Sequence, residues 1–159
     1  MSYTSISRFL EAIAFSELYS RQMRFISGPR QSGKTTIAKN ILHITKNSSF
    51  YYNWDKKEIR DRYRKEIVFL AADLLKNKRS DKLWVCFDEI HKIPKWKNIL
   101  KDFFDTYEDK IHFIITGSAR LDMFRKSGDS LAGRYFLFKL NPLLLSEITG
   151  RKIQDILPG

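Results

Sequence analysis

The sequence predicts an α/β fold built on a parallel sheet, and three observations support this fold class. Five short apolar runs alternate along the chain with segments of helical periodicity. One run, residues 83–87, is apolar at every position, as expected of a strand buried on both faces of a parallel sheet. A glycine-rich segment, residues 28–36, lies between the first predicted strand and a predicted helix. Parallel strands need crossover connections, and the predicted helices supply them.

The first predicted elements are a helix, a strand and a second helix. The N-terminal helix is amphipathic and is expected to pack on the following domain through Ile6, Phe9, Leu10 and Ile13. Residues 24–27 are a short predicted strand. The second helix starts near Gly33 and ends where residues 46–49 break its apolar pattern, which consists of Ile37, Ile41, Leu42 and Ile44.

The middle of the chain repeats this alternation. Residues 50–54 predict a strand, and one long helix follows it with Ile59, Tyr63, Ile67, Leu70 and Leu74 at three- to four-residue steps. The turn-rich residues 77–81 end that helix, and the apolar strand 83–87 comes next.

The last third adds a helix, two strands and a short helix. Pro94 is typical of a helix start, and the inward face of that helix is Trp96, Ile99, Leu100, Phe103 and Tyr107. Residues 111–116 and 135–140 are the fourth and fifth strands, separated by a polar stretch. Asn141 and Pro142 open the short helix, which carries Leu143, Leu144, Leu145 and Ile148.

Composition restricts the class of protein. The 159 residues suit one domain, and 43% hydrophobic and 14% aromatic content excludes a disordered chain. The lone cysteine, Cys86, lies in an apolar run and is expected in the core. No apolar stretch approaches the roughly 18 residues of a membrane span, and Glu11 and Glu17 break the N-terminal apolar pattern. We therefore expect a cytoplasmic protein that does not contact membranes.

The net charge of +11 leaves two interpretations open. Such a field attracts nucleotides, nucleic acid or anionic lipid. A solvated basic surface explains the same count, and residues 56–66 mix both signs as an exposed helix does.

The glycine-rich segment predicts a phosphate-binding loop. Gly28, four further residues and then Gly33, Lys34 and Thr35 satisfy the pattern G-x-x-x-x-G-K-[ST]. Glycines let the backbone curl so that successive N–H groups face one phosphate, and the helix start adds its positive dipole end. Lys34 is expected to reach the β- and γ-phosphates, and the Thr35 hydroxyl to coordinate Mg²⁺.

Two acids follow the third predicted strand. Asp88 and Glu89 stand at its carboxyl end, where ligands of parallel sheets collect. We expect Asp88 to hold Mg²⁺ through water and Glu89 to orient or deprotonate the water that attacks the γ-phosphate. An exposed acidic turn is the alternative.

Further polar residues follow the other strands. Thr116 and Ser118 end the fourth strand, where a hydroxyl can bond the γ-phosphate or serve as a helix cap. Three arginines are candidates for neutralising phosphoryl charge, and Arg134 is preferred over Arg120 and Arg125 because it follows Gly133 directly before a strand. For Arg30 and Asp55 a structural role is favoured.

The segments GPRQSGKTT, FDEIHKIPKW, ITGSAR and SLAGRYFLFKLNPLLLSEI together resemble the ATPase core of a bacterial and archaeal family of the AAA+ superfamily. The resemblance covers roughly residues 9–148. It implies a three-layer P-loop NTPase with a RecA-like sheet of five parallel strands in the order 5-1-4-3-2, and ATP and Mg²⁺ as cofactors.

Site residues follow from the resemblance by position. The Walker A loop corresponds to Gly28, Pro29, Arg30, Gln31, Ser32, Gly33, Lys34, Thr35 and Thr36. Asp88 and Glu89 match the Walker B pair, and Thr116 and Ser118 match the sensor-1 region. Arg134 lies in an L-x-G-R pattern and corresponds to a phosphate-sensing or finger-type arginine, which in this superfamily often comes from a neighbouring subunit.

The resemblance also bears on domain organisation. We expect an N-terminal helical segment at 1–22, an ATPase core at 23–150 and the start of a truncated C-terminal extension at 151–159. Family members usually continue into a C-terminal domain, and we expect residues 151–159 to be the start of such an extension. His91 stands where glutamine is common, and the string D-E-I-H also resembles a helicase motif, but a helicase needs a second lobe.

The leading functional hypothesis is a Mg²⁺-dependent ATPase domain that binds ATP and ADP and drives or gates a partner domain or client. Self-association is a further expectation. A small-molecule kinase and a nucleic-acid-binding module switched by ATP are the alternatives. A GTPase is disfavoured because residues 77–81 lack the N-K-x-D spacing and precede the Asp88 strand.

Overall fold

The computed structural model describes residues 8–65, 68–77, 81–118 and 130–149. Within these residues five strands form one sheet in which every neighbouring pair is parallel. The strands are β1 (Met23–Ser27), β2 (Tyr51–Asn53), β3 (Leu83–Asp88), β4 (Ile111–Gly117) and β5 (Tyr135–Lys139). Their order is β2-β3-β4-β1-β5, which confirms the predicted order 5-1-4-3-2 and the RecA-like fold.

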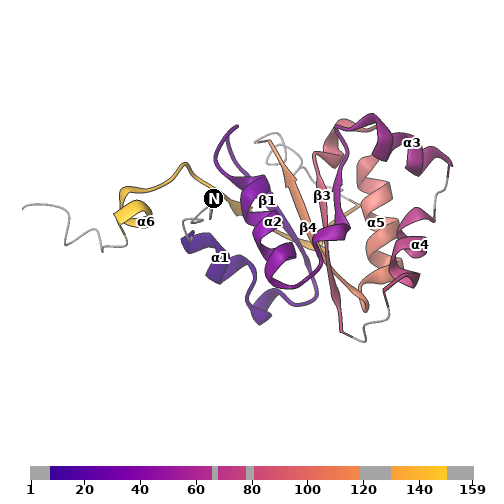
Figure 1. Ribbon diagram of the computed structural model, residues 1–159, viewed down its shortest axis with the longest axis horizontal. Helices are drawn as coiled ribbons and strands as arrows, with labels where there is room; N and C mark the ends of the chain where they lie inside the picture. Colours follow the sequence, from indigo (N-terminus) through magenta and orange to yellow (C-terminus); the bar gives the residue numbers. More distant parts are fainter. Residues whose placement is uncertain (1–7, 66–67, 78–80, 119–129, 150–159) are drawn as a thin grey trace, which may run out of the picture.

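Helices cover both faces of the sheet and complete three layers (Figure 1). The helices are α1 (Phe9–Ala14), α2 (Lys34–Ile44), α3 (Lys57–Lys65), α4 (Phe69–Leu75), α5 (Trp96–Tyr107) and α6 (Leu145–Thr149). Short 3-10 turns are η1 (Glu17–Tyr19), η2 (Ser48–Phe50) and η3 (Ile90–Lys92). α1 and α2 lie on one side of the sheet, and α4 and α5 lie on the other. None of the helices in the described part of the chain is long and apolar enough to cross a membrane.

The period-two alternation of the strands divides the core between these two sides. In β3, Val85 and Phe87 pack with residues of α4 and α5, whereas Cys86 packs toward α2. The Cys86 side chain is completely buried, as its apolar surroundings in the sequence predicted. By the same alternation, Asp88, the polar residue at the end of β3, lies on the α2 side of the sheet.

The strand register brings the carboxyl ends of four strands together. Asp88 pairs with Asn53 of β2 on one side and with Thr116 of β4 on the other. Ser27, the last residue of β1, pairs with Gly117. The glycine-rich loop and the acidic pair therefore start from the same edge of the sheet.

The prediction of one long helix after β2 is wrong. α3 ends at Lys65 and α4 begins at Phe69, and Arg62 of α3 forms an ion pair with Asp73 of α4 at 2.6 Å. In a continuous helix these two residues would lie roughly 16 Å apart along the axis. The buried Phe69 packs on Tyr52 and Tyr63, which the change of direction between α3 and α4 makes possible.

The expected inward face of the N-terminal helix is only partly correct. Leu10 packs against the core cluster on the α2 side, but Phe9 and Ile13 are more than half exposed. α1 has six residues, and its buried position is Ala14, so its contact face is narrower than the periodicity suggested. Ile6 lies outside the described residues.

Candidate nucleotide-binding site

The loop between β1 and α2 depends on its two glycines. A Cβ atom at Gly28 would lie closer to the Leu140 carbonyl oxygen than real Cβ atoms approach, and 3.1 Å from Ser32 Oγ. Gly33 precedes α2 with a φ of 95°, which is in the left-handed region that glycine adopts without steric cost. Gly28 therefore permits close packing beneath the loop, and Gly33 permits the turn into the helix.

The start of α2 is open to an anion. Its N-cap is Gly33, and no side chain caps the first turn. The first backbone N–H groups of a helix lack partners within it, and the helix dipole adds partial positive charge at that end. Thr35 and Thr36 lie in this turn and line a cavity at the carboxyl edge of the sheet. This arrangement is suited to phosphate.

Lys34 places an ammonium group beside the loop. Its Nζ donates to the carbonyl oxygens of Gly28 at 3.0 Å and Pro29 at 2.6 Å, and these bonds stabilise the backbone at the start of the loop. The ammonium has three N–H groups, and the third can donate to a phosphate oxygen. Burial lowers the pKa of Lys34, and the nearby carboxylates of Glu89 and Asp88 oppose this shift.

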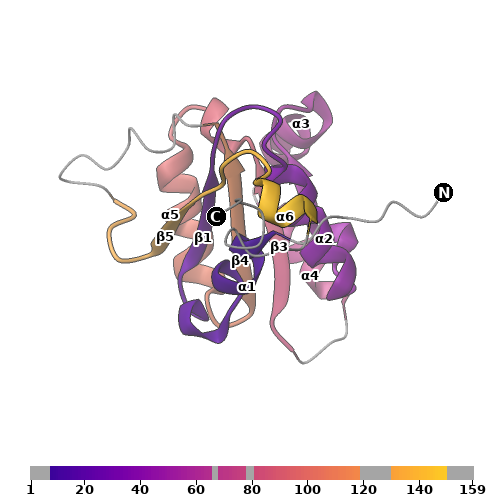
Figure 2. The same cartoon turned by 90° about the vertical axis from the view of Figure 1, so that its left-hand side faces the viewer.

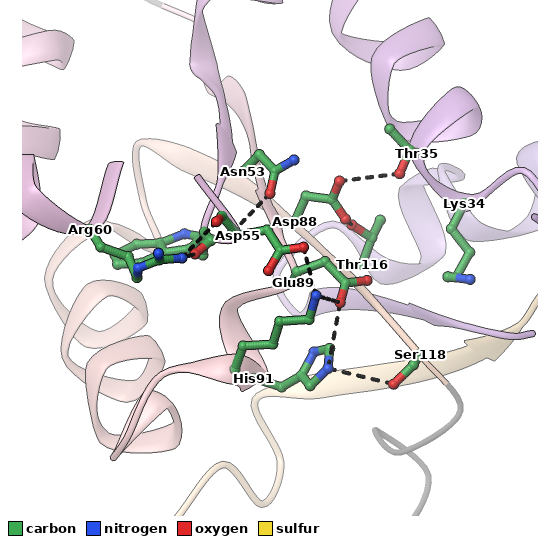
Figure 3. A network of polar contacts seen from close by, with 12 residues as sticks. Lys34, Thr35, Asn53, Asp55, Arg60, Asp88, Glu89, His91, Thr116 and Ser118 are labelled. Carbon is green, nitrogen blue, oxygen red and sulfur yellow. Dashed lines mark hydrogen bonds and ion pairs between the residues drawn. The ribbon is translucent and has the colours of Figure 1, made fainter. Parts of the chain in front are cut away.

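The Asp88 carboxylate accepts hydrogen bonds from three hydroxyl groups. Thr35 Oγ1 donates to Oδ2 at 3.1 Å, Tyr51 donates to the same oxygen, and Thr116 donates to Oδ1. Figure 3 shows Asp88 between Thr35 on one side and Glu89 on the other. Burial and the neighbouring Asp88 raise the pKa of Tyr51, so its hydroxyl remains a donor at neutral pH.

Glu89 lies in the turn after β3 with a left-handed φ of 62°. Its carboxylate forms an ion pair with Lys92 Nζ at 3.3 Å, and Lys92 also donates to Asp55 Oδ2 at 2.7 Å. His91 Nε2 is 3.7 Å from the Glu89 carboxylate and 3.5 Å from Ser118 Oγ. The bond from Lys92 lowers the pKa of Asp55. Glu89 is thus placed within a small network of polar side chains (Figure 3).

A cavity of about 1300 Å³ unites these groups. It is lined by Arg30, Gln31, Gly33, Lys34, Thr35, Thr36, Asp55, Asp88, Glu89, His91, Lys92 and Ser118. The volume exceeds the range typical of small-molecule sites, and the lining carries both cationic and anionic groups. Such a lining suits a highly charged ligand bound together with a cation.

The donor set at Thr35 and Asp88 fits Mg²⁺. This ion prefers oxygen ligands, and proteins usually supply only one or two carboxylates while substrate phosphates and waters complete the octahedron. A hydroxyl and a carboxylate 3.1 Å apart match that requirement. Among the described residues no cluster of three or more His, Cys, Asp or Glu side chains could hold a metal, so a closed all-protein cage is not formed there.

Most of the predicted site residues are brought together. Arg30, Gln31, Gly33, Lys34, Thr35, Thr36, Asp88, Glu89 and Ser118 line the cavity. Gly28 and Pro29 contribute carbonyl oxygens to Lys34, and Ser32 is a buried member of the loop. Asp55, for which a structural role was favoured, also lines the cavity and is bound by Lys92.

Arg134 is not part of this cavity. It lies at the opposite edge of the sheet, directly before β5, and its guanidinium contacts both Asp105 oxygens at 2.8 and 3.2 Å. Its carbonyl oxygen accepts a bond from the Met23 amide at the start of β1. The other two candidate arginines, Arg120 and Arg125, lie outside the described residues.

Three residues at or beside the cavity had no role in the sequence predictions. Tyr51 bonds Asp88, Lys92 bonds Glu89, and Arg8 donates to the carbonyl oxygen of Ser32 in the loop. Tyr51 lies on the same face of β2 as Asn53, next to the strand that ends in Asp88, and the strand order therefore contained a signal for it. For Arg8 the local sequence carries no such signal.

A glycine-rich loop between strand and helix, its lysine, an acidic pair on a nearby strand and this strand order define a P-loop NTPase. A family model described as an AAA domain matches residues 20–149. The match covers most of the chain, and the chain therefore belongs to this AAA domain family.

The chain also resembles known proteins in sequence and in fold. The chain is 28% identical over 131 residues to the uncharacterized proteins Rv2008c of Mycobacterium tuberculosis and Mb2031c of Mycobacterium bovis. The match covers 82% of this chain and 27% of each relative, so the chain spans about a quarter of the relatives' length. A solved structure of C. elegans PCH-2 shares the fold with a TM-score of 0.51 at 16% identity, over 83% of this chain and 38% of that one.

Proposed function

We propose that this chain is a Mg²⁺-dependent ATP-binding domain that hydrolyses ATP to drive or gate a partner domain or client. One observation carries the proposal. The ammonium of Lys34, the Thr35 hydroxyl and the carboxylates of Asp88 and Glu89 line the same cavity at the uncapped start of α2. A polyanion with a bound cation satisfies all of these groups together.

Phosphate binding is assigned to the loop and to Lys34. The first-turn amides of α2 donate to phosphate oxygens, and the third N–H of Lys34 donates to the β- and γ-phosphates. Thr35 and Asp88 would hold Mg²⁺, which when bound neutralises charge on the phosphate oxygens. Tyr51 and Thr116 orient the Asp88 carboxylate by their hydrogen bonds.

Water activation is assigned to Glu89. A carboxylate accepts the proton of an attacking water only if one of its oxygens faces that water. Glu89 lines the cavity, and its ion pair with Lys92 at 3.3 Å holds its orientation. Ser118 lies in the same lining and can donate to the γ-phosphate or the water.

The test compares nucleotide binding and turnover in purified wild-type protein, Lys34→Ala and Glu89→Gln. Wild-type protein should gain thermal stability with ATP and Mg²⁺ and should release phosphate. Lys34→Ala should lose most of the nucleotide-dependent shift. Glu89→Gln should keep the shift and lose turnover by roughly 10²–10⁴-fold, the usual contribution of a general base.

The matched control is Lys110→Ala, which removes an exposed lysine beside the amino end of β4 and far from the cavity. It should bind and hydrolyse as wild type does. Wild-type turnover in Glu89→Gln would contradict the general-base assignment. A nucleotide shift in Lys34→Ala equal to that of wild type would contradict the assignment of the site itself.

A further inference from the structure

A buried arginine reaches the loop from outside the nucleotide-binding motif. Arg8 precedes α1 and is 6% exposed. Its Nη1 donates to the Ser32 carbonyl oxygen at 2.8 Å, and its Nη2 donates to the Asn141 carbonyl oxygen at 2.6 Å. Its Nε lies 3.1 Å from Oε1 of Glu147 in α6. One guanidinium therefore joins three segments that are distant in the sequence.

Glu147 completes the connection on the side of α6. Its side chain is 4% exposed. Oε1 accepts the Phe9 amide and Oε2 accepts the Leu144 amide, both at 3.0 Å. Burial raises the pKa of Glu147, but the two amides and Arg8 outweigh that effect and lower it, so the carboxylate is charged at neutral pH. Figure 2 shows α1 and α6 close together in front of the sheet.

The contact with Ser32 sets the direction of a peptide group in the loop. A trans peptide is planar, and its carbonyl and N–H point in opposite directions. Arg8 binds the Ser32 carbonyl, so the Gly33 N–H of the same peptide points away from Arg8. Gly33 lines the cavity, and a Cβ atom added to Gly33 would lie 3.4 Å from Arg8 Nη1. Arg8 therefore orients an amide that is available to a phosphate.

A planar guanidinium group suits this position better than an ammonium group would. Planar guanidinium groups bind several oxygen acceptors in fixed directions, whereas an ammonium is a compact point charge. Removing Glu147 would leave the Arg8 charge buried with two carbonyl oxygens only, and removing Arg8 would leave a buried carboxylate with two amides. Arg8 and Glu147 therefore each depend on the other to balance a buried charge.

We infer that Arg8 is a positioning residue for nucleotide binding and that the Arg8–Glu147 pair links the phosphate loop to α6. The inference rests on the proposed function, because its ligand is the same nucleotide. Ordering of the loop by phosphate stabilises the Ser32 contact of Arg8, and through Glu147 it stabilises the position of α6. By reciprocity, the docked α6 raises the affinity for nucleotide.

The first experiment measures the affinity for a fluorescent ADP analogue in Arg8→Lys and Glu147→Gln. Arg8→Lys keeps the positive charge and loses the planar guanidinium. Glu147→Gln keeps the shape of the side chain and loses its negative charge. Each should weaken binding by about fivefold or more, which is the usual lower bound of coupling between sites. The matched control is Arg21→Lys, which alters the exposed pair of Arg21 and Glu108 and should bind as wild type does.

The second experiment measures the hydrogen exchange of the α6 amides, first in wild-type protein. Exchange of the amides at 145–149 should slow several-fold when the nucleotide binds, and Arg8→Lys should abolish this response. A purely structural arginine would change stability without making α6 protection depend on nucleotide.

The outcomes separate the two claims. If wild-type protein fails to bind nucleotide, the proposed function fails and the inference fails with it. If wild-type protein binds nucleotide but α6 exchange is unchanged, the inference is overturned and the proposed function stands. The same holds if Arg8→Lys and Glu147→Gln bind nucleotide with wild-type affinity. Should either variant not fold, the wild-type exchange measurement still decides.

Discussion

At the residue scale, Gly28→Ala should damage both the fold and the site. An added Cβ would meet the Leu140 backbone and Ser32, and backbone cannot move aside as a flexible side-chain end can. Overpacking of this kind costs about 1–3 kcal/mol of unfolding free energy, and we expect that loss together with weaker nucleotide binding. Chemical denaturation and nucleotide titration measure the two effects.

The control for this substitution is Gly133→Ala. Gly133 has a φ of 75°, and nothing lies within 4 Å of an added Cβ. The strained backbone should cost about 1–2 kcal/mol without any effect on nucleotide affinity. If Gly28→Ala bound nucleotide as tightly as Gly133→Ala does, the close approach beneath the loop would have no role in binding.

The site residues that the sequence predicted belong to short local patterns. Lys34 and Thr35 belong to a glycine motif, and Asp88 with Glu89 ends an apolar run, so local sequence identified them. Arg8 contacts the loop through Ser32, 24 positions away in the sequence. Contacts of that kind depend on the packing of α1 and α6, which no local pattern specifies.

At the element scale, the ion pair between α3 and α4 should give stability that depends on pH. Burial raises the pKa of Asp73, but hydrogen bonds from Arg62 and Tyr52 outweigh that effect and hold the pKa below its ordinary value. A depressed carboxyl pKa stabilises the fold above the unfolded value, near 3.9, and this stability is lost as pH falls through the folded pKa.

Asp73→Asn tests this contribution. At pH 7 the variant should lose about 1.5–3 kcal/mol of unfolding free energy, because Arg62 keeps no charged partner on α4. The difference from wild type should shrink below pH 4. Asp61→Asn is the control, since its pair with Arg64 lies on the exposed surface of α3, and it should change little. A pH-independent difference for Asp73→Asn would contradict the assignment.

The elements show which sequence signals were sufficient. All five strands were predicted within one or two residues, because each is an apolar run, and β1, β3 and β4 are also largely buried. The break between α3 and α4 was missed because Ile59, Tyr63, Leu70 and Leu74 keep helical spacing across it. That break is fixed by Arg62 and Asp73, which meet only after the chain has changed direction.

At the scale of the whole molecule, the predicted site residues lie at two opposite edges of the sheet. The loop, Asp88 and Glu89 lie at the carboxyl ends of the strands, whereas Arg134 lies at the amino end of β5. The Met23 amide bonds Arg134, and the five residues of β1 then span roughly 16 Å to the loop. That span is longer than an arginine side chain, so Arg134 cannot serve the cavity of its own chain.

A catalytic role for Arg134 would therefore need a cavity on a neighbouring copy, and mixing of variants tests this role. We expect Arg134→Ala and Glu89→Gln each to be nearly inactive alone. Mixed one to one, they should recover roughly a quarter of the wild-type rate, because random head-to-tail assembly joins an intact Glu89 and an intact Arg134 at one interface in four.

The matched control mixes Lys34→Ala with Glu89→Gln. Both residues line one cavity of a single chain, so no assembly can restore an intact site and no rate should return. Native mass spectrometry establishes whether mixed assemblies form. If they form and Arg134→Ala with Glu89→Gln stays inactive, Arg134 acts through its contacts with Asp105 and the Ser130 carbonyl oxygen, which would make it a structural residue beside β5.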